Sequence, residues 1–210
     1  MQTPGMLTLA IDCATEACSV SLFDGAQRLA GDFRVLGRGH AEQLIPMIAA
    51  LPDRGRAQRI AVAMGPGSFT GVRVGLAAAR ALAFAWNAEL VGYPTLALIA
   101  AMARAKLGQH AITVAMTGGH GEWFVESFDG DGLPIRTLAS LTPGEAAAAA
   151  EVRVTGSQAE ALVALRGSGL ALPLLPDAGA VMLLPRSIWQ AKVQPIYGRA
   201  PDARLPASPA

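Results

Sequence analysis

The chain has 210 residues and a formal net charge of +1, so unaided binding of nucleic acid is not its expected role, because phosphate neutralisation needs a concentrated basic surface. Hydrophobic residues make up 52% of the chain and charged residues 16%, yet no uncharged apolar run reaches the length of a membrane span. We therefore expect a soluble cytoplasmic protein with an apolar surface, no export signal, and two reduced cysteines, Cys13 and Cys18.

The first half of the chain alternates strand and helix patterns in the order βββαβαβα. A strand that ends on a carboxylate opens the chain, and an Asp24-Gly25 turn typical of a hairpin follows. Later helices have apolar residues at helical spacing. The predicted strands are Leu7–Asp12, Ala17–Phe23, Ala26–Phe33, Ile60–Met64 and Leu90–Tyr93, and the predicted helices are His40–Leu51, Phe69–Trp86 and Thr95–Leu107.

A glycine-rich turn, Gly65–Gly71, joins the fourth strand to the longest helix. Such a turn can point backbone N–H groups at a phosphate, so Gly65 and Gly67 are candidates for nucleotide binding. The spacing G-x-G-x-x-x-G fits neither common nucleotide fingerprint, and no Gly-Lys-Ser/Thr follows. A tight strand-to-helix turn capped by Ser68 or Thr70 explains the same residues.

The helix Phe69–Trp86 is apolar over nearly its whole circumference, so it must be buried on two sides. Its own sheet supplies one side, and a helix of this chain or of another chain supplies the second. A face rich in small residues would let that second helix approach closely, although an internal core helix explains the face equally well. The face comprises Gly71, Gly75, Ala78, Ala79, Leu82 and Trp86.

The second half of the chain begins as a repeat of the first. Thr8–Gly25 and Thr113–Gly130 align without a gap at an offset of 105, with six identities in eighteen positions. The shared order of strand, turn, strand and Asp-Gly turn argues for a duplicated unit. A duplicated βββαβα unit predicts an α/β fold of the actin/Hsp70/sugar-kinase (ASKHA) type with a reduced C-terminal half.

Later elements are shorter, and we divide the chain into an N-terminal lobe (1–108), a reduced C-terminal lobe (109–194) and a proline-rich tail (195–210) that we expect to be partly disordered. The Leu/Pro-rich stretch 170–184 has no clear period and predicts neither a helix nor a strand. The remaining predicted elements are a strand over Leu133–Ala139 and helices over Pro143–Ala150 and Gln158–Leu165.

The residues offer little chemistry. Asp12 stands where this fold class places a carboxylate near nucleotide phosphates, but it can equally cap the following turn, and its counterpart in the alignment is Thr117. The three histidines, His40, His110 and His120, form no pair at metal-binding spacing. We therefore expect no catalytic residues, no metal and no cofactor.

Four segments carry a resemblance to a known family: IDCATEACSVSLFDG, HAEQLIP, AMGPGSFTGVRVGLAAARALA and PIYGRAPDA. Together they resemble the TsaB (YeaZ) family, the non-catalytic subunit of the bacterial machinery for tRNA threonylcarbamoyladenosine. The match covers most of residues 7–107. The chain departs from the family pattern at Ala41, where serine is usual, and at Thr117–Gly119, where Asp-Ala-Arg is usual.

The resemblance implies a scaffold, not an enzyme. The catalytic relative TsaD has a His-x-x-x-His metal site whose positions fall here at Pro94 and Leu98, neither of which can bind a metal. The implied partners are a TsaD-type catalytic subunit, a TsaE-type ATPase and a second copy of the chain, with tRNA bound only through the complex and no membrane contact.

In the family the partner surface is a helical bundle made by the first two helices, which correspond here to His40–Leu51 and Phe69–Trp86. Two rival functions remain: a stand-alone nucleotide-binding ATPase or kinase, and a glycoprotease-like metallopeptidase. The residues predicted at the partner interface are His40, Leu44, Met47, Gly71, Gly75, Ala78, Ala79, Leu82 and Trp86.

Overall fold

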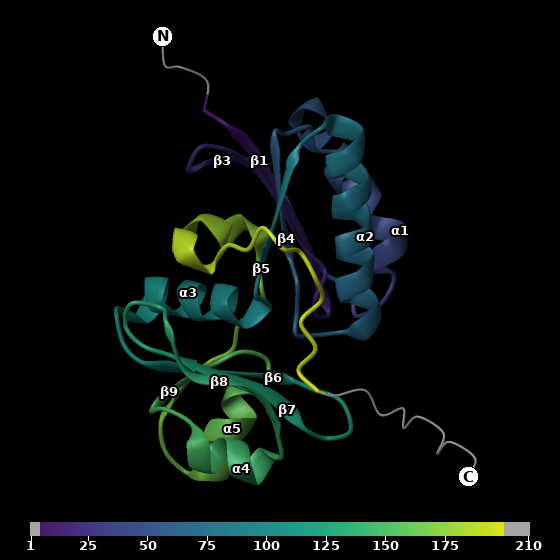
Figure 1. The fold of residues 1–210 in the computed structure, drawn as a ribbon. Coiled ribbons are helices and arrows are strands. Elements are labelled where there is room, and N and C mark those ends of the chain that lie inside the picture. Colours follow the sequence, from purple (N-terminus) through teal and green to yellow (C-terminus); the bar gives the residue numbers. More distant parts are fainter. Residues whose placement is uncertain (1–4, 200–210) are drawn as a thin grey trace, which may run out of the picture.

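Two five-stranded mixed sheets, one above the other in Figure 1, form the framework of the computed structural model, which describes residues 5–199. The first sheet has the strand order β3-β2-β1-β4-β5, and the second has the order β10-β9-β6-β7-β8. The first comprises β1 (Leu7–Asp12), β2 (Ala17–Asp24), β3 (Gln27–Val35), β4 (Arg59–Ala63) and β5 (Glu89–Tyr93). The second comprises β6 (Ile112–Thr117), β7 (Trp123–Phe128), β8 (Pro134–Leu141), β9 (Arg153–Thr155) and β10 (Leu170–Leu172).

Helices α1 (His40–Ala49) and α2 (Phe69–Trp86) cover one face of the first sheet (Figure 1). Helix α2 begins at the Ser68 cap, whose Oγ accepts a hydrogen bond from the Gly71 N–H at 3.3 Å. It ends at Asn87, which adopts the left-handed conformation at φ 53°. These boundaries match the prediction, whereas α1 ends two residues early and is followed by the short 3₁₀ helix η1 (Pro52–Gly55).

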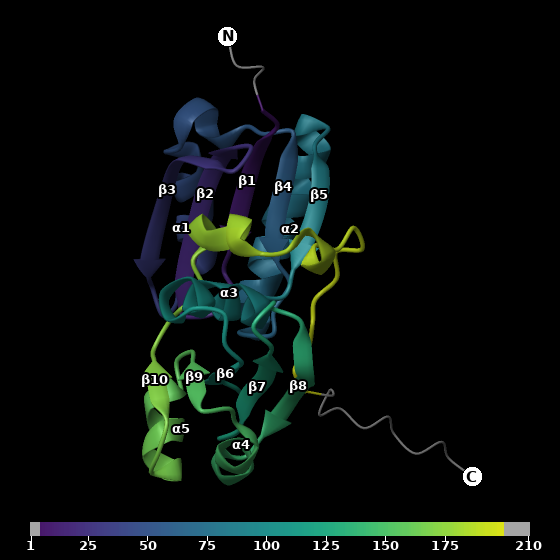
Figure 2. The ribbon, with the colours of Figure 1, turned by 90° about the vertical axis from the view of Figure 1, so that its left-hand side faces the viewer.

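The opposite face of the first sheet is covered by residues from the far end of the chain (Figures 1 and 2). After β10, the chain returns to the first sheet through the 3₁₀ helices η2 (Ala178–Leu183) and η3 (Arg186–Ile188). The Ala178 N–H donates to Ser19 Oγ at 2.9 Å. Residues 178–194, which the sequence-based division assigns to the second lobe, therefore contribute to the core of the first.

A final segment, residues 190–199, runs from β5 past α2 towards the second sheet, and we call it the C-terminal strap. Gln190 and Gly92 form a β-bridge, and the Ile196 N–H donates to the Met64 carbonyl at 2.7 Å. Arg80 of α2 donates to the Val193 carbonyl at 2.8 Å. The part of the predicted tail that follows, residues 200–210, lies outside the described residues.

The second sheet is covered on one face by α4 (Pro143–Ala149) and α5 (Ala159–Arg166), and on the other by α3 (Thr95–Leu107). Helix α3 therefore lies between the two sheets (Figure 2). Among residues 5–199, no helix is long and apolar enough to cross a membrane.

The duplicated hairpins differ in register by one residue, which the gapless sequence alignment hides. Asp12 pairs with Ser19, whereas Thr117 pairs with Trp123. Helices α1 and α2 cover the β1 face that carries Ile11, and α4 and α5 cover the β6 face that carries Ala115. Since neighbouring residues of a strand face opposite ways, Asp12 lies on the face away from α1 and α2, and in β6 the residue on the corresponding face is Met116 and not Thr117.

Candidate functional site

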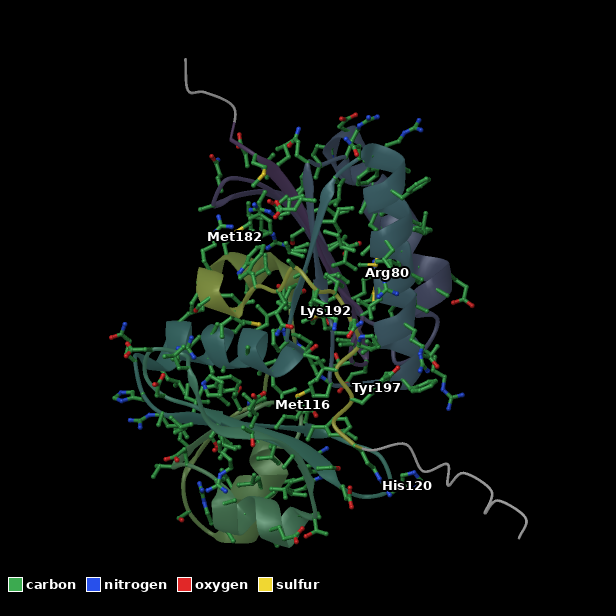
Figure 3. All side chains as sticks on the ribbon, viewed as in Figure 1. Arg80, Met116, His120, Met182, Lys192 and Tyr197 are labelled. Carbon is green, nitrogen blue, oxygen red and sulfur yellow. The ribbon has the colours of Figure 1, made fainter. Side chains whose placement is uncertain are left out.

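A cleft of about 870 Å³ opens between the two sheets where the β1–β2 turn, the Gly65–Gly71 turn and the β6–β7 turn meet. The C-terminal strap closes one side of it. In Figure 3, Met116 of β6 and Tyr197 of the strap lie close to this region. The lining residues are Ala14, Thr15, Glu16, Pro66, Gly67, Ser68, Phe69, Val72, Arg73, Met116, Thr117, Gly118, Gly119, Phe124 and Ile196–Arg199.

The glycine-rich turn is shaped by close backbone packing. A Cβ atom on Gly67 would overlap the Ala14 carbonyl oxygen, and the same oxygen accepts the Ser68 N–H at 2.7 Å. Gly65 has φ 94°, which favours glycine, and it does not line the cleft. The turn therefore directs one of its amides at the chain itself, as expected of a tight strand-to-helix connection.

Asp12 lies behind the cleft and is not among its lining residues. Its side chain is fully buried, its Oδ1 accepts the Ala14 N–H at 2.9 Å, and Tyr93 Oη lies 3.5 Å from its Oδ2. Burial raises the pKa of Asp12 to about 7, although the two hydrogen bonds oppose this shift. In the structure, the Asp12 carboxylate therefore caps the turn that follows β1.

The second sheet contributes neutral groups to the cleft. Met116 packs at the base, and Thr117 is exposed at the end of β6. Thr117 Oγ1 accepts from Gln158 Nε2 at 2.8 Å and lies 3.2 Å from Ser157 Oγ. The described lining residues on this side include no carboxylate that could pair with Asp12 across the cleft.

An arginine–aromatic cluster forms the mouth of the cleft. Arg73 of α2 lies over the ring of Phe69, with its guanidinium carbon 3.2 Å from the ring centroid, and its Nη2 donates to Tyr197 Oη at 2.7 Å. The cluster fastens the C-terminal strap to the first turn of α2. The strap also reaches the second sheet, because Gly198 packs directly against the Phe124 ring.

The small-residue face of α2 lies against the chain's own sheet. A Cβ atom on Gly71 would overlap the Cys13 carbonyl oxygen, and one on Gly75 would lie 3.5 Å from Cys13 Cβ and 3.8 Å from Val62 Cγ2. Ala79 is fully buried. These three residues therefore have no surface to offer a partner helix, and the small side chains instead let α2 pack closely on β1 and β4.

The other residues predicted at the interface are divided between the core and its edge. His40, Leu44 and Met47 of α1 are buried, and the imidazole of His40 lies 3.3 Å from the Ala17 carbonyl oxygen. The half-buried members are Ala78, Leu82 and Trp86 of α2.

The structure exposes a different set of apolar residues on the same two helices. Phe84 of α2 is 92% exposed and Ile45 of α1 is 50% exposed. Together with exposed Ala49, Ala77 and Ala81 they form what we call the α1–α2 outer surface. Spacing on α2 could have found it, because Ala77, Ala81 and Phe84 share the side opposite the glycines.

Metal-binding groups do not gather in the described part of the chain, where no three His, Cys, Asp or Glu side chains are placed to hold one ion. Pro94 is the residue before α3, and Leu98 is fully buried within it.

The architecture is an α/β fold of the ASKHA type, which confirms the prediction. A structure of the ethanolamine utilization protein EutJ from Carboxydothermus hydrogenoformans shares this fold alone, with a TM-score of 0.52 at 12% identity, over 88% of this chain and 90% of that chain. A structure of an uncharacterized protein with similarity to peptidase YEAZ, from Pseudomonas aeruginosa, superimposes with a TM-score of 0.79 at 27% identity, over 92% of this chain and 100% of that chain.

The family model described as TsaD, tRNA N6-adenosine threonylcarbamoyltransferase, matches residues 34–160. A curated relative, the tRNA threonylcarbamoyladenosine biosynthesis protein TsaB of Escherichia coli, is 36% identical over 60% of this chain. The chain belongs to this family, and its relatives and structural neighbours place it with the TsaB (YeaZ) proteins. It spans about half the length of the two TsaB relatives: 56% of the E. coli protein and 44% of the Haemophilus influenzae one.

Proposed function

We propose that this protein is a non-catalytic scaffold subunit in the biosynthesis of threonylcarbamoyladenosine next to the tRNA anticodon. In this role it binds a TsaD-type catalytic subunit through the α1–α2 outer surface and enables a TsaE-type ATPase to join the complex. The free chain pairs with a second copy through the same surface. The modification of tRNA takes place in the cytoplasm, and tRNA is bound by the complex.

The exposure of Phe84 is the observation that carries this proposal. Phe84 is 92% exposed in the single chain. Burying its side chain in an interface would contribute about 2 kcal/mol of binding free energy. Ile45 stands half exposed on the neighbouring helix. Exposed aromatic side chains of this kind, here with Ala77 and Ala81 on one side, supply the centre of many protein interfaces. The names of the curated relatives support tRNA threonylcarbamoyladenosine as the pathway.

The state of Asp12 supports the absence of catalysis. A catalytic or metal-binding carboxylate must reach its ligand, and Asp12 is buried behind the cleft with both oxygens engaged. In addition, Met116 occupies the equivalent place in the second sheet. We therefore expect the chain alone to hydrolyse no ATP and to carry no stoichiometric metal.

A stand-alone nucleotide-binding ATPase or kinase is the second candidate, because a cleft of about 870 Å³ is large enough for a nucleotide. Metal analysis and calorimetric titration with ATP and Mg²⁺ separate the two functions. Saturable ATP binding with turnover by the chain alone would favour this candidate. Tightly held zinc with peptide cleavage would instead favour the peptidase that the P. aeruginosa structure's title mentions.

Replacing Phe84 with glutamate is expected to weaken binding of the TsaD-type subunit at least about tenfold, since a charge would be buried in an apolar interface. Because the side chain is exposed in the single chain, the melting temperature should not change at protein concentrations too low for two copies to pair. Ile135→Glu on β8, where the isoleucine is 54% exposed, is the matched control and should bind normally. Size-exclusion chromatography and calorimetry with the partner check both. Equal binding by Phe84→Glu and wild type would place the interface elsewhere.

A further inference from the structure

The two cysteines lie directly opposite each other at the end of the first hairpin. Asp12 pairs with Ser19, so the next residues in register are Cys13 and Cys18. Their sulfur atoms are 3.5 Å apart and share a hydrogen bond. Opposed residues of an antiparallel pair have Cα atoms about 4.5–5.5 Å apart, within the range that a disulfide spans.

The hydrogen bond between the two thiols and the charges around them make the two sulfurs unequal. The hydrogen bond between the two thiols lowers the pKa of Cys18 and raises the pKa of Cys13. Arg34, the cross-strand neighbour of Cys18, acts in the same direction on Cys18, while burial, Asp12 and Asp32 oppose it. Cys18 is thus the sulfur that becomes a thiolate first.

A pocket of about 430 Å³ lies next to the buried pair. Two of its lining residues contact the backbone beside the thiols: His40 lies 3.3 Å from the Ala17 carbonyl oxygen, and Gly71 packs on the Cys13 carbonyl oxygen. Neither sulfur lines the pocket, so a small uncharged oxidant such as hydrogen peroxide is the reagent that we expect to reach the buried thiols from this side.

We propose that Cys13 and Cys18 form a peroxide-sensitive dithiol that closes into an intrachain disulfide. The Cys18 thiolate attacks one peroxide oxygen, the O–O bond breaks, and the hydroxide that leaves takes up a proton to become water. Cys13 sulfur then attacks the resulting sulfenic acid, the S–O bond breaks, and a second water leaves as the S–S bond forms. The two thiols are oxidised by two electrons, and hydrogen peroxide is reduced to two waters.

The turn between the two cysteines forms part of the cleft between the sheets. The residues between the cysteines include Ala14, Thr15 and Glu16, which line the cleft. A disulfide needs the sulfurs to approach from 3.5 Å to about 2.05 Å, and it would tie together the two ends of this turn. Gly71 packs on the Cys13 carbonyl, and the Ser68 N–H donates to the Ala14 carbonyl, so the disulfide would form directly beneath the start of α2.

The test uses the full chain, treated with hydrogen peroxide and then unfolded in an alkylating reagent. Wild type should lose both thiols together, with a mass lower by two hydrogen atoms, a Cys13–Cys18 cross-linked peptide, and full recovery in dithiothreitol. Cys18→Ser should react at least about tenfold more slowly than Cys13→Ser, because Cys18 is the attacking thiolate. Cys13→Ser should give a sulfenic or sulfinic acid instead of an internal disulfide.

Two results would overturn the proposal. One is a wild-type chain that keeps both thiols open to alkylation under peroxide doses that oxidise free cysteine. The other is oxidation that joins cysteines of different chains only. The mapping on wild type decides between these outcomes even if a serine variant does not fold.

Discussion

Replacing Gly71 with alanine is expected to destabilise the chain by about 3 kcal/mol, the upper end of what overpacking costs. The added Cβ would overlap the Cys13 carbonyl oxygen. This oxygen belongs to the backbone just after β1, so it cannot move aside as the flexible end of a side chain could. The first turn of α2 would have to shift away from the sheet. Urea denaturation of the isolated chain measures the loss.

The matched control is Gly75→Ala, one helical turn further along the same face. Its Cβ would make ordinary contacts at 3.5 Å with Cys13 Cβ and 3.8 Å with Val62 Cγ2, and alanine favours the helix by about 1 kcal/mol. We expect stability equal to or above that of wild type, and a loss only with Gly75→Leu. Equal stabilities for the two alanine variants would contradict the packing described for this face.

Replacing Asp12 with asparagine is expected to remove much of the pH dependence of stability. Burial raises the pKa of Asp12 to about 7 from 3.8. Between these pH values the folded chain holds a proton that the unfolded chain has released, so stability falls as pH rises from about 4 to about 7 and is then constant. The total loss at this carboxyl is roughly 4 kcal/mol.

Asparagine keeps an oxygen to accept the Ala14 N–H and carries no charge, so Asp12→Asn should match wild type near pH 4 and exceed it by up to roughly 4 kcal/mol at pH 8. Burial also raises the pKa of Glu126 in β7 to about 7. Glu126→Gln is therefore the companion control, and it should remove a separate part of the pH dependence of the free energy of unfolding. Denaturant titrations at several pH values test this. A stability difference between Asp12→Asn and wild type that does not vary with pH would refute the ionisation argument.

The sequence was sufficient for most elements of the fold because their signals are local. Ser68 caps α2 and the helix begins at Phe69, as predicted. The orientation of α2 was not accessible, because a helix that is apolar almost all round does not reveal which apolar side meets the sheet. The close approach of Cys13, which follows β1, and of Val62 in β4 distinguishes the glycine side from the Phe84 side.

The long-range features could not be predicted for a related reason. A gapless alignment cannot reveal that the register of one hairpin is shifted by a residue. The shift means that Met116, and not Thr117, lies on the face of β6 that corresponds to the Asp12 face of β1. The Leu/Pro-rich stretch 170–184 has no period because it contains only the three-residue strand β10 and the 3₁₀ helix η2, and η2 takes its conformation from the first sheet on which it packs. The hydrogen bond between Arg73 and Tyr197, which are 124 positions apart in the sequence, could not be predicted for the same reason.

The return of residues 178–197 to the first sheet affects how the protein is made. On the ribosome, β1 to β5 with α1 and α2 emerge early, but Ser19 lacks the Ala178 N–H and Met64 lacks the Ile196 N–H until the end of the chain has been synthesised. The first sheet therefore leaves one face open to water during most of translation, when unfinished surfaces are most prone to aggregate. Completion of this half of the molecule is delayed until the last stretch of the chain is released.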